Sequence, residues 1–388
     1  MPVSQPHRIA FALPHLKAGG IEVVVRSLLR GLDRSRWAPM LILNRREGEL
    51  LEGVPGDIPV LGCGGRSMLP RAWALARLLR QHRAELVYSG TNAMNLSAAL
   101  AVSLMPRQRR PRLVISEHTT VENYLAKARH QHLRRLLIRM LYPRADHLAV
   151  PLEAIGRGWQ QALALAGPPL ACLPNPVLEE AALAQLLAQP PERVPGRIVA
   201  AGRLIADKGH DVLIRAFAKV LAAHPQAELL IYGSGPEKPA LAQLARSLGI
   251  ADRVHLMGYS SDLLRDFARA ELAVLPSLRE GFGNVAVEAL AAGTPLIASR
   301  CLGPEAILQG GKLGLLVPPG NVPELASAIK DALGGPGDAR LREDARAAMH
   351  PYRIKTAVQA FETLASGLLA PSGSVAPDVG SSAAARSR

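Results

Sequence analysis

Short β-type runs alternate with helical patterns along most of this chain, and the alternation restarts after residue 195. Strands that alternate with helices in this way form parallel sheets covered by helices. The pattern therefore predicts an α/β fold with a separate sheet in each half. The length agrees with this prediction, because one hydrophobic core rarely serves 388 residues.

The expected strands are short apolar runs in both halves. In the first half they are Arg8–Leu13, Met40–Asn44, Leu86–Ser89, Leu113–Ser116 and His147–Val150. In the second half they are Arg197–Ala201, Ala227–Tyr232, Arg253–Met257, Leu272–Pro276 and Pro295–Ala298. Helical spacing predicts helices such as Ile21–Leu32, Met68–His82, His210–Ala223 and Pro239–Leu248.

Prolines and composition give the expected domain boundaries. An N-terminal domain is predicted over residues 1–178 and a C-terminal domain over residues 196–350. A linker is predicted at residues 179–195, because the prolines of QPPERVP restrict the backbone. A C-terminal helix is expected within 351–370. Residues 371–388 carry almost no large apolar side chains and are expected to be disordered.

Cysteine usage and hydropathy indicate a cytoplasmic protein. Cys63, Cys172 and Cys301 are far apart, which argues against a disulfide framework and against a cysteine zinc site. The N-terminus lacks the pattern of a signal peptide. No run approaches the roughly 20 apolar residues that span a bilayer.

The net charge of +14 is concentrated in the first half. Residues 1–180 hold 24 Lys and Arg against 13 Asp and Glu, whereas the remaining residues hold 22 against 19. Such an excess is typical of proteins that bind nucleic acid, an anionic lipid surface or a phosphorylated substrate, and it also follows from an Arg-rich composition alone.

The segment Val274–Ser299, VLPSLREGFGNVAVEALAAGTPLIAS, predicts an anion site. Its Gly281 and Gly283 let backbone amides approach a ligand closely, and a helix beginning near Asn284 directs its free N–H groups to the same place. Glu280 lies in this loop. Glu288 is the one charged side chain of the otherwise apolar helical run, so either a buried arginine or the hydroxyl groups of a ligand diol must pair with it.

A second segment, GRLIADKGHDVLIRAF, places two cations five positions apart. Arg203 follows a strand and Lys208 stands at the entrance to a helix. At the carboxyl edge of a parallel sheet, both converge on a phosphate-sized target or form an exposed basic loop.

In the first half, Gly19 and Gly20 connect a strand to a helix, and VISEHTTVENYL places Glu117 and His118 at a strand end. A histidine there is either a structural hydrogen-bonding group or a catalyst. Neither G-x-G-x-x-G nor G-x-x-x-x-G-K-[ST] occurs, which argues against a nicotinamide dinucleotide site and an ATPase.

The segment KARHQHLRRLLIRMLYPR predicts a basic amphipathic helix. Such a helix either lies on anionic lipid or packs on its own domain as an ordinary surface helix. Its apolar and basic residues are Leu133, Leu136, Leu137 and Met140, interleaved with Arg129, Arg134, Arg135 and Arg139.

The run EGFGNVAVEALAAGTPLIAS, preceded by GRLIADKGHDVLIRAF, resembles the family 4, group 1 glycosyltransferases of GT-B architecture, of the kind that build bacterial envelope polysaccharides and lipid-linked oligosaccharides. YGSGP at 232–236 and MGYSSD at 257–262 lie at family positions. The resemblance covers residues 8–370. It implies two Rossmann-like domains with parallel sheets facing an interdomain cleft, an acceptor in the first domain and a nucleotide sugar in the second. It also implies that the C-terminal helix within 351–370 packs back towards the first domain.

The resemblance also implies roles for single residues. Arg203 and Lys208 would hold the diphosphate of the donor, and Glu288 would accept hydrogen bonds from its ribose. His118 and Glu280 would act at the transferred sugar, and Glu117 would have a secondary role near the acceptor. The further donor-binding positions implied are Gly19, Gly20, Gly233, Gly235, Tyr259, Gly281, Phe282, Gly283, Asn284 and Val285.

The expected activity is retaining transfer of a UDP-linked hexose or N-acetylhexosamine to a lipid-linked or saccharide acceptor. No D-x-D and no His/Asp cluster with metal-ligand spacing occurs, so we expect no metal and no cofactor. The anionic inner face of the cytoplasmic membrane is the expected partner of the first half, and nucleic acid is not expected.

Three alternatives stay open at this point. A glycoside hydrolase also uses two carboxylates, although it needs no diphosphate site. A nucleotide-sugar epimerase of similar fold would consume the donor without an acceptor. A basic nucleic-acid or membrane-surface binder would explain the charge, although no helix-turn-helix, zinc finger or aromatic RNA platform is recognisable.

Overall fold

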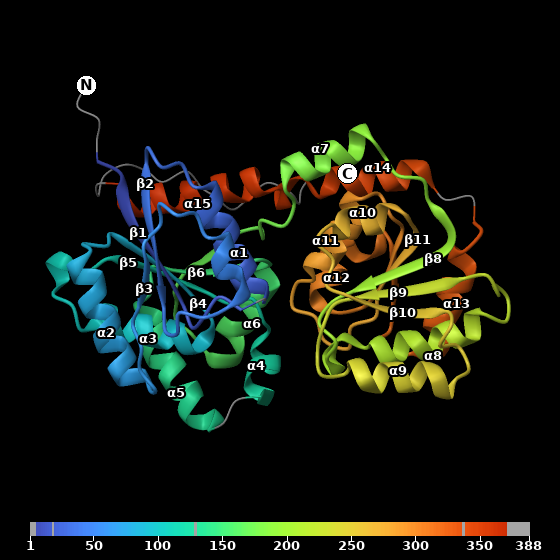
Figure 1. Cartoon of the computed structure of the whole chain (residues 1–388). Helices are drawn as coiled ribbons and strands as arrows, with labels where there is room; N and C mark the ends of the chain where they lie inside the picture. Colours follow the sequence, from blue (N-terminus) through green and yellow to red (C-terminus); the bar gives the residue numbers. More distant parts are fainter. Residues whose placement is uncertain (1–4, 18, 128–129, 336–337, 371–388) are drawn as a thin grey trace, which may run out of the picture. The chain divides into compact units, whose positions relative to one another are not determined.

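Two parallel sheets, one in each half of the chain, organise the computed structural model, which describes residues 5–17, 19–127, 130–335 and 338–370 (Figure 1). The chain divides into a first unit, which ends at Pro176 and includes the helix from Ile354, and a second unit, Val177–Arg353. The expected α/β fold is confirmed. The predicted tail 371–388 and Arg129 lie outside the described residues.

The first unit has a seven-stranded sheet in the order β3-β2-β1-β4-β5-β6-β7. Its strands are β1 (His7–Leu13), β2 (Trp37–Leu43), β3 (Val60–Gly62), β4 (Leu86–Gly90), β5 (Arg112–Ser116), β6 (His147–Val150) and β7 (Leu170–Cys172). Its α-helices are α1 (Gly20–Gly31), α2 (Met68–Gln81), α3 (Asn92–Ser103), α4 (Val121–Lys127), α5 (Gln131–Leu141), α6 (Glu153–Leu163) and α15 (Ile354–Leu369). Short 3₁₀ turns are η1 (Glu49–Gly53), η2 (Arg107–Arg109) and η3 (Tyr142–Arg144).

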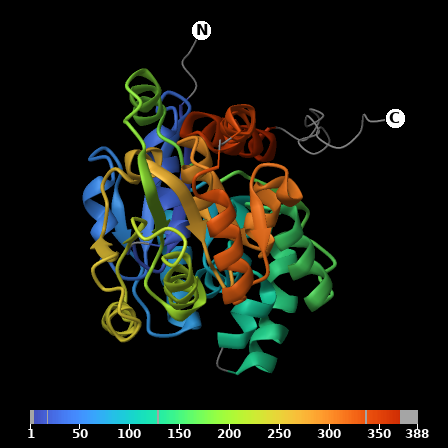
Figure 2. The same cartoon turned by 90° about the vertical axis from the view of Figure 1, so that its right-hand side faces the viewer.

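The second unit has a six-stranded sheet in the order β10-β9-β8-β11-β12-β13, with helices on both faces (Figures 1 and 2). Its strands are β8 (Val194–Ala201), β9 (Glu228–Tyr232), β10 (Val254–Gly258), β11 (Ala270–Leu275), β12 (Leu296–Ser299) and β13 (Leu315–Val317). Its α-helices are α7 (Glu180–Ala188), α8 (His210–Val220), α9 (Lys238–Ser247), α10 (Leu263–Ala268), α11 (Asn284–Ala291), α12 (Leu302–Ile307), α13 (Val322–Ala332) and α14 (Ala339–Ala348). Its 3₁₀ turns are η4 (Ala206–Lys208), η5 (Gln309–Gly311) and η6 (His350–Tyr352).

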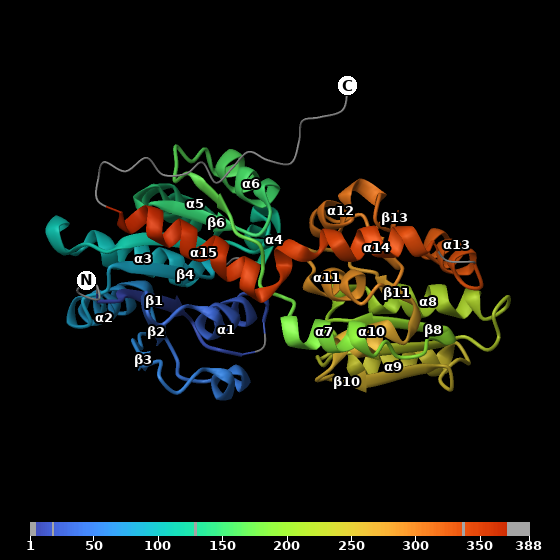
Figure 3. The same ribbon diagram turned by 90° about the horizontal axis from the view of Figure 1, so that it is seen from above.

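The central strands are apolar on both sides because helices cover both faces of each sheet. In β1, the residues from Ile9 to Leu13 are fully buried. α15 packs in the core of the first unit (Figure 3), where the ring of Phe361 lies 5.6 Å from Phe11 and 5.5 Å from Tyr88. α15 therefore completes the core to which β1 also contributes.

Three strands were not expected from the sequence: β3, β7 and β13. Each has three residues and lies at the edge of its sheet, so each is too short to show a periodic pattern. The predicted linker 179–195 contains α7, whose Leu183 and Leu186 are buried, and the start of β8. Those residues belong to the second unit because they pack on it.

The predicted basic helix is α5, and it packs on its own unit through Ile138 and Leu141. Ile138 and Leu141 point into the core, whereas Leu133, Leu136 and Met140 are 54–58% exposed. Leu137 packs partly against the core. Arg134 turns inward, where its Nη1 donates a hydrogen bond to Tyr124 Oη at 2.9 Å. Within the described residues, no helix is both long and apolar enough to cross a bilayer.

Candidate functional site

Two loops meet at the carboxyl edge of the second sheet, one after β8 and one after β11. The backbone N–H groups of Leu278 and Arg279 donate to the carbonyl of Asp207 at 2.9 and 3.2 Å. Gly209, at φ +63°, lies so close to the second loop that a Cβ there would be 2.2 Å from the carbonyl oxygen of Pro276. The two motifs quoted from the sequence therefore form one continuous surface.

Lys208 and Glu280 are joined on this surface. The Nζ of Lys208 donates to Oε2 of Glu280, and the hydroxyl of Ser277 donates to the same oxygen at 3.3 Å. The side chains of Lys208 and Glu280 are 22% and 11% exposed, so the pair is largely shielded from water. Arg203 is exposed and makes no ion pair within the described residues. Because Lys208 is neutralised by Glu280, Arg203 supplies the uncompensated positive charge.

The N-terminus of α11 opens at the same loop. Gly283 precedes the helix at φ +91°, and no described side chain caps it. Gly281 is partly exposed, as are Asn284 and Val285 in the first turn. Phe282 is 4% exposed and its ring packs edge-on against Tyr352 at 5.4 Å, so its side chain belongs to the core. Free N–H groups at such a terminus favour an anion.

Glu288 lies in the middle of α11. Burial raises the pKa of its carboxyl group to about 7. In the part of the chain that the structure describes, no arginine or other donor is bonded to it. Of the two partners that the sequence allows, a buried arginine is therefore not found among the described residues.

Gly233 and Gly235, which follow β9, pack against the backbone of the loop after β8. A Cβ at Gly233 would lie 1.9 Å from the carbonyl oxygen of Gly202, and one at Gly235 would lie 2.3 Å from that of Leu204. The need for glycine is thus explained by close backbone packing. Tyr259, which follows β10, is 84% exposed.

The two glycines of the first unit that are predicted to bind the donor, Gly19 and Gly20, lie at the start of α1. Gly19 precedes the helix, and a Cβ there would be 2.4 Å from a carboxylate oxygen of the buried Glu22. Gly20 has open space around it. The backbone at Gly20 is therefore accessible at the carboxyl end of β1.

His118 follows β5. Its Nε2 lies 2.8 Å from Ser116 Oγ, which also accepts a hydrogen bond from Tyr88 Oη at 2.8 Å. Burial lowers the pKa of His118 to about 4, so the imidazole is neutral at pH 7. It lines a small cavity of the first unit together with Val24 and Phe361.

Glu117 points to the other face of the strand end, as expected for consecutive residues. It is 4% exposed, and its Oε1 accepts hydrogen bonds from Tyr142 Oη and from Asn95 Nδ2 at 3.0 Å. Burial raises the pKa of Glu117 to about 7. Its carboxyl group is occupied inside the unit and is not brought together with His118.

Within the described ranges, no group of three or more His, Cys, Asp or Glu is arranged to hold a metal ion.

Comparison with protein families matches both halves. The family described as Glycosyltransferase Family 4 matches residues 18–180, and the family described as Glycosyl transferases group 1 matches residues 195–334. The chain belongs to the family 4, group 1 glycosyltransferases. The resemblance seen in the motifs is thereby confirmed.

Curated relatives of this family 4 chain match over limited stretches. It is 40% identical over 202 residues to an exopolysaccharide phosphotransferase of Streptomyces coelicolor. The matched stretch covers 51% of this chain and 20% of that protein. It is also 40% identical over 166 residues to a D-inositol 3-phosphate glycosyltransferase of Rhodococcus jostii. This match covers 40% of this chain and 36% of the relative. The chain thus spans well under two thirds of the length of these relatives.

Solved glycosyltransferases share the GT-B fold over nearly the whole chain. A glycosyltransferase of Rickettsia africae superposes with a TM-score of 0.77 at 17% identity, covering 95% of this chain and all of that one. HepE of Anabaena, in complex with UDP, superposes with a TM-score of 0.74 at 22% identity, covering 92% of this chain and all of that one. At these identities the likeness establishes the fold.

Sequence reasoning missed three side chains that hold this family 4 site together. Ser277, which is fully buried, orients Glu280, and Asp207 pairs with Arg279 at 3.7 Å. Ser277 stands three residues before Glu280 in the strand-end loop, so its position was visible in the motif. The Asp207 contact joins distant segments and was not.

Proposed function

We propose that this chain transfers a sugar from a nucleoside-diphosphate sugar to an acceptor, with retention of the anomeric configuration. The observation that carries the proposal is the joined pair of loops in the second unit. Arg203 has no ion-pair partner within the described chain, Lys208 is held by Glu280, and the N-terminus of α11 opens beside them. These groups match the charge that develops on a departing diphosphate.

Each residue has a proposed role in donor binding. Arg203 and Lys208 stabilise the diphosphate, and Glu280 holds Lys208 in place and accepts hydrogen bonds from sugar hydroxyls. The amides of Gly281–Asn284 bind phosphate oxygens. Glu288 accepts hydrogen bonds from the ribose diol, which supplies the donors that the described residues do not.

His118 is proposed to act at the transferred sugar from the first unit, where the acceptor binds. Departure of the nucleoside diphosphate leaves an oxocarbenium-like sugar, so a neutral imidazole that donates or accepts a hydrogen bond suits this position better than a cation. Its low pKa supports the neutral form.

A uridine nucleotide is the proposed donor, carrying a hexose or an N-acetylhexosamine. The UDP bound to HepE of Anabaena favours this base. The test is a thermal-shift panel of UDP-, GDP- and ADP-linked sugars, in which a ligand at a hundred times its Kd stabilises by about 2.7 kcal/mol. If no nucleotide sugar stabilises the protein, the donor proposal is wrong.

Two activity assays separate the rival activities. A glycoside hydrolase would cleave a nitrophenyl glycoside, and an epimerase would consume the nucleotide sugar without an acceptor. Transfer should continue in excess EDTA, because Arg203, Lys208 and the helix N-terminus supply the positive charge. Complete loss of transfer that manganese or magnesium restores would contradict this.

We also propose that the chain works at the inner face of the cytoplasmic membrane, in envelope glycan synthesis. The exposed residues Leu133, Leu136 and Met140 of α5 lie beside the exposed Arg135 and Arg139. The patch continues towards Leu104, which is 58% exposed, because Arg144 bonds both Met140 and Ser103. An apolar face flanked by arginines suits an anionic bilayer.

A further inference from the structure

Two buried hydroxyl groups lead to the imidazole of His118. Tyr88 Oη lies 2.8 Å from Ser116 Oγ, and Ser116 Oγ lies 2.8 Å from His118 Nε2. Tyr88 is in β4 and Ser116 ends the neighbouring strand β5. Their side chains belong to residues that are 2% and 1% exposed, so bulk water does not compete for these bonds. We call Tyr88, Ser116 and His118 the Tyr–Ser–His row.

Tyr88 is the donor at one end of the row. Burial raises the pKa of its phenol to about 12, so the single hydroxyl proton is present at neutral pH. The ring packs against Phe11 and Phe361, with centroids 5.7 and 5.5 Å away, which fixes the direction of its C–O bond. Among the described residues, Ser116 Oγ is the one acceptor that this hydroxyl reaches. Tyr88 therefore donates to Ser116.

The proton of Ser116 is thereby directed to His118. Within the described part of the chain, His118 Nε2 is the only polar atom besides Tyr88 Oη that is bonded to Ser116 Oγ. If Nε2 carried a proton, Oγ would accept two hydrogen bonds and its own proton would be left unpaired in a buried site, which is unfavourable. Ser116 therefore donates, and Nε2 accepts.

This direction assigns the tautomer of His118. Burial lowers the pKa of the imidazole to about 4, so the ring carries a single N–H proton at neutral pH. Because Nε2 accepts a hydrogen bond, that proton is on Nδ1. No described residue is bonded to Nδ1, so its N–H is free to donate. Free histidine in water prefers the other tautomer, so the protein has to impose this one.

The backbone around His118 is held by side chains of two helices. Asn95 of α3 donates from Nδ2 to the carbonyl of Ser116 at 2.9 Å. Trp159 of α6 donates from Nε1 to the carbonyl of Thr119 at 2.8 Å. The peptide is thus fixed before and after His118, while the Tyr–Ser–His row fixes the ring.

We propose that Tyr88 and Ser116 are positioning residues that hold His118 as the Nδ1–H tautomer, so that Nδ1–H donates a hydrogen bond to an oxygen of the transferred sugar. This inference rests on the proposed function, which places His118 at that sugar, and it adds the direction of the hydrogen bond. A donor that is fixed beforehand needs no reorganisation during the reaction. The other tautomer would present an acceptor at Nδ1, and this donor would be lost.

NMR reads the tautomer directly. Two-bond ¹H–¹⁵N correlation spectra of protein labelled at histidine distinguish protonated from unprotonated ring nitrogens, and His118→Asn identifies the signals of His118 among the 11 histidines. At neutral pH we expect Nδ1 protonated and Nε2 unprotonated in the wild type. Ser116→Ala should shift His118 towards the Nε2–H form, whereas Ser116→Thr keeps the hydroxyl and should retain the Nδ1–H form.

Two further variants support this reading. Tyr88→Phe leaves Ser116 able to accept from Nε2, so it should populate both tautomers. Tyr142→Phe is the matched control, because it also removes a buried phenol, but one that donates to Glu117 on the other face of the strand end. It should leave the tautomer of His118 unchanged.

Kinetics separate positioning from a general loss of stability. Ser116→Ala should lower kcat at least tenfold and leave the KM for the nucleotide sugar unchanged, and Ser116→Thr should restore kcat. In the His118→Ala background, Ser116→Ala should have no further effect, because the ring that it positions is absent.

Three results would overturn the proposal: a wild-type proton on Nε2, an unchanged tautomer in Ser116→Ala, or equal losses of kcat for Ser116→Ala with and without His118. Failure of the proposed function has a different signature. In that case His118→Ala would keep the wild-type kcat, while the spectra would still decide whether Tyr88 and Ser116 place the proton of His118.

Discussion

Burial shifts the pKa of three side chains, downwards for His118 and upwards for Glu117 and Glu288. His118 is kept neutral by a pKa lowered to about 4, while Glu117 and Glu288 have pKa values raised to about 7. The cause in each case is the cost of placing a charge away from water. Hydrogen bonds from Tyr142 and Asn95 partly offset this cost for Glu117, whereas within the described residues Glu288 has no such donor. Glu288 is therefore the group whose ionisation a ligand would change most.

Glu288→Gln should weaken the binding of UDP-glucose by roughly ten- to a hundred-fold. A hydrogen bond to a charged group contributes about 1.5–3 kcal/mol, and the amide loses the charge but keeps the shape. Isothermal titration measures the change, and Glu343→Gln on the exposed side of α14 is the matched control. Unchanged affinity for Glu288→Gln would show that the ribose binds elsewhere.

The same carboxyl group predicts a pH dependence. Its pKa of about 7 in the unliganded protein means that lowering the pH below 7 protonates it, so UDP-glucose affinity should fall by up to tenfold for each further unit. The free energy of unfolding depends on pH in the opposite direction. Between about pH 4.5 and 7 the folded protein keeps this proton, whereas the unfolded chain has released it, so the contribution of Glu288 to stability falls as the pH rises through this range. Titrations and urea unfolding at pH 6 and pH 8 should both show flatter profiles for Glu288→Gln.

His118→Ala should lower kcat by about a hundred-fold, which is the scale of one hydrogen bond made in the transition state. The affinity for UDP should be unchanged, because His118 and the diphosphate loops lie in different units. Steady-state kinetics and titration with UDP separate the two quantities. A rise in KM without a fall in kcat would assign His118 to acceptor binding instead.

At the scale of single elements, α5 and the two loops of the second unit are held in place by different kinds of contact. The diphosphate loops are held by backbone bonds between them, such as Leu278 N–H to Asp207 O. α5 is held by Ile138 and Leu141, and its other apolar face is left exposed. An element whose apolar side chains remain outside the core is available for a partner.

The exposed face of α5 predicts attachment to anionic vesicles. Each arginine near such a surface contributes about 1 kcal/mol, so Arg135→Glu with Arg139→Glu should release the protein from phosphatidylglycerol vesicles. Sedimentation at low salt measures this. Arg215→Glu with Lys219→Glu, on α8 of the second unit, is the control. If wild type stays in the supernatant with anionic and neutral vesicles alike, α5 is only a solvated helix.

At the scale of the whole molecule, the chain returns to its first unit at its end. α15 places Val358, Phe361 and Ala365 in the core that contains β1 and β4. Glu362 on the same helix accepts a hydrogen bond from the backbone N–H of Asp33. The first unit therefore depends on residues more than 170 positions away from the end of its main segment.

Phe361→Ala should destabilise the first unit by about 3–5 kcal/mol, the usual cost of removing a buried aromatic ring. Hydrogen exchange should rise in β1 and β4 and stay unchanged in β8 and β9. Leu369→Ala, at the partly buried end of α15, is the control and should have a small effect. Equal acceleration in both sheets would mean that the two units unfold together.

The sequence by itself determined the alternation of strands and helices, and with it both parallel sheets. It also indicated the family, because the two continuous runs that contain Arg203, Lys208, Glu280 and Glu288, GRLIADKGHDVLIRAF and EGFGNVAVEALAAGTPLIAS, are visible without a structure. Such patterns are local: strand and helix periods and glycine turns act over a few residues.

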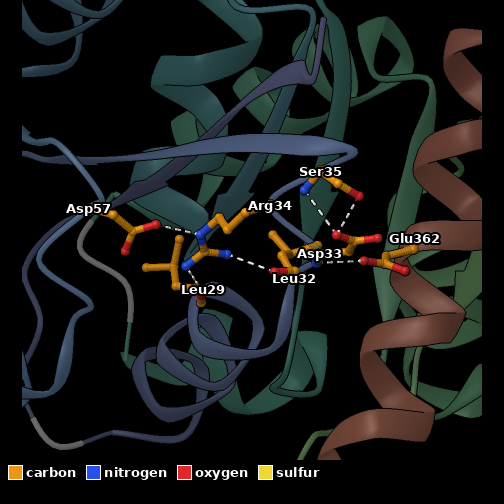
Figure 4. A network of polar contacts seen from close by, with 7 residues as sticks. All are labelled: Leu29, Leu32, Asp33, Arg34, Ser35, Asp57 and Glu362. Carbon is orange, nitrogen blue, oxygen red and sulfur yellow. Dashed lines mark hydrogen bonds and ion pairs between the residues drawn. The ribbon is translucent and has the colours of Figure 1, made fainter. Parts of the chain in front are cut away.

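Only the tertiary structure decided which side chains meet. It placed the carboxyl group of Glu117 in a buried hydrogen-bond network and left the side chain of His118 lining a cavity, although the two residues are adjacent in the sequence. It exposed Leu133 and buried Ile138 on one helix, and it paired Arg34 with Asp57 (Figure 4) and Arg112 with Asp146, which are distant in the sequence. The physical reason is that burial and charge compensation depend on neighbours that are distant in the chain, and neither is encoded in local spacing.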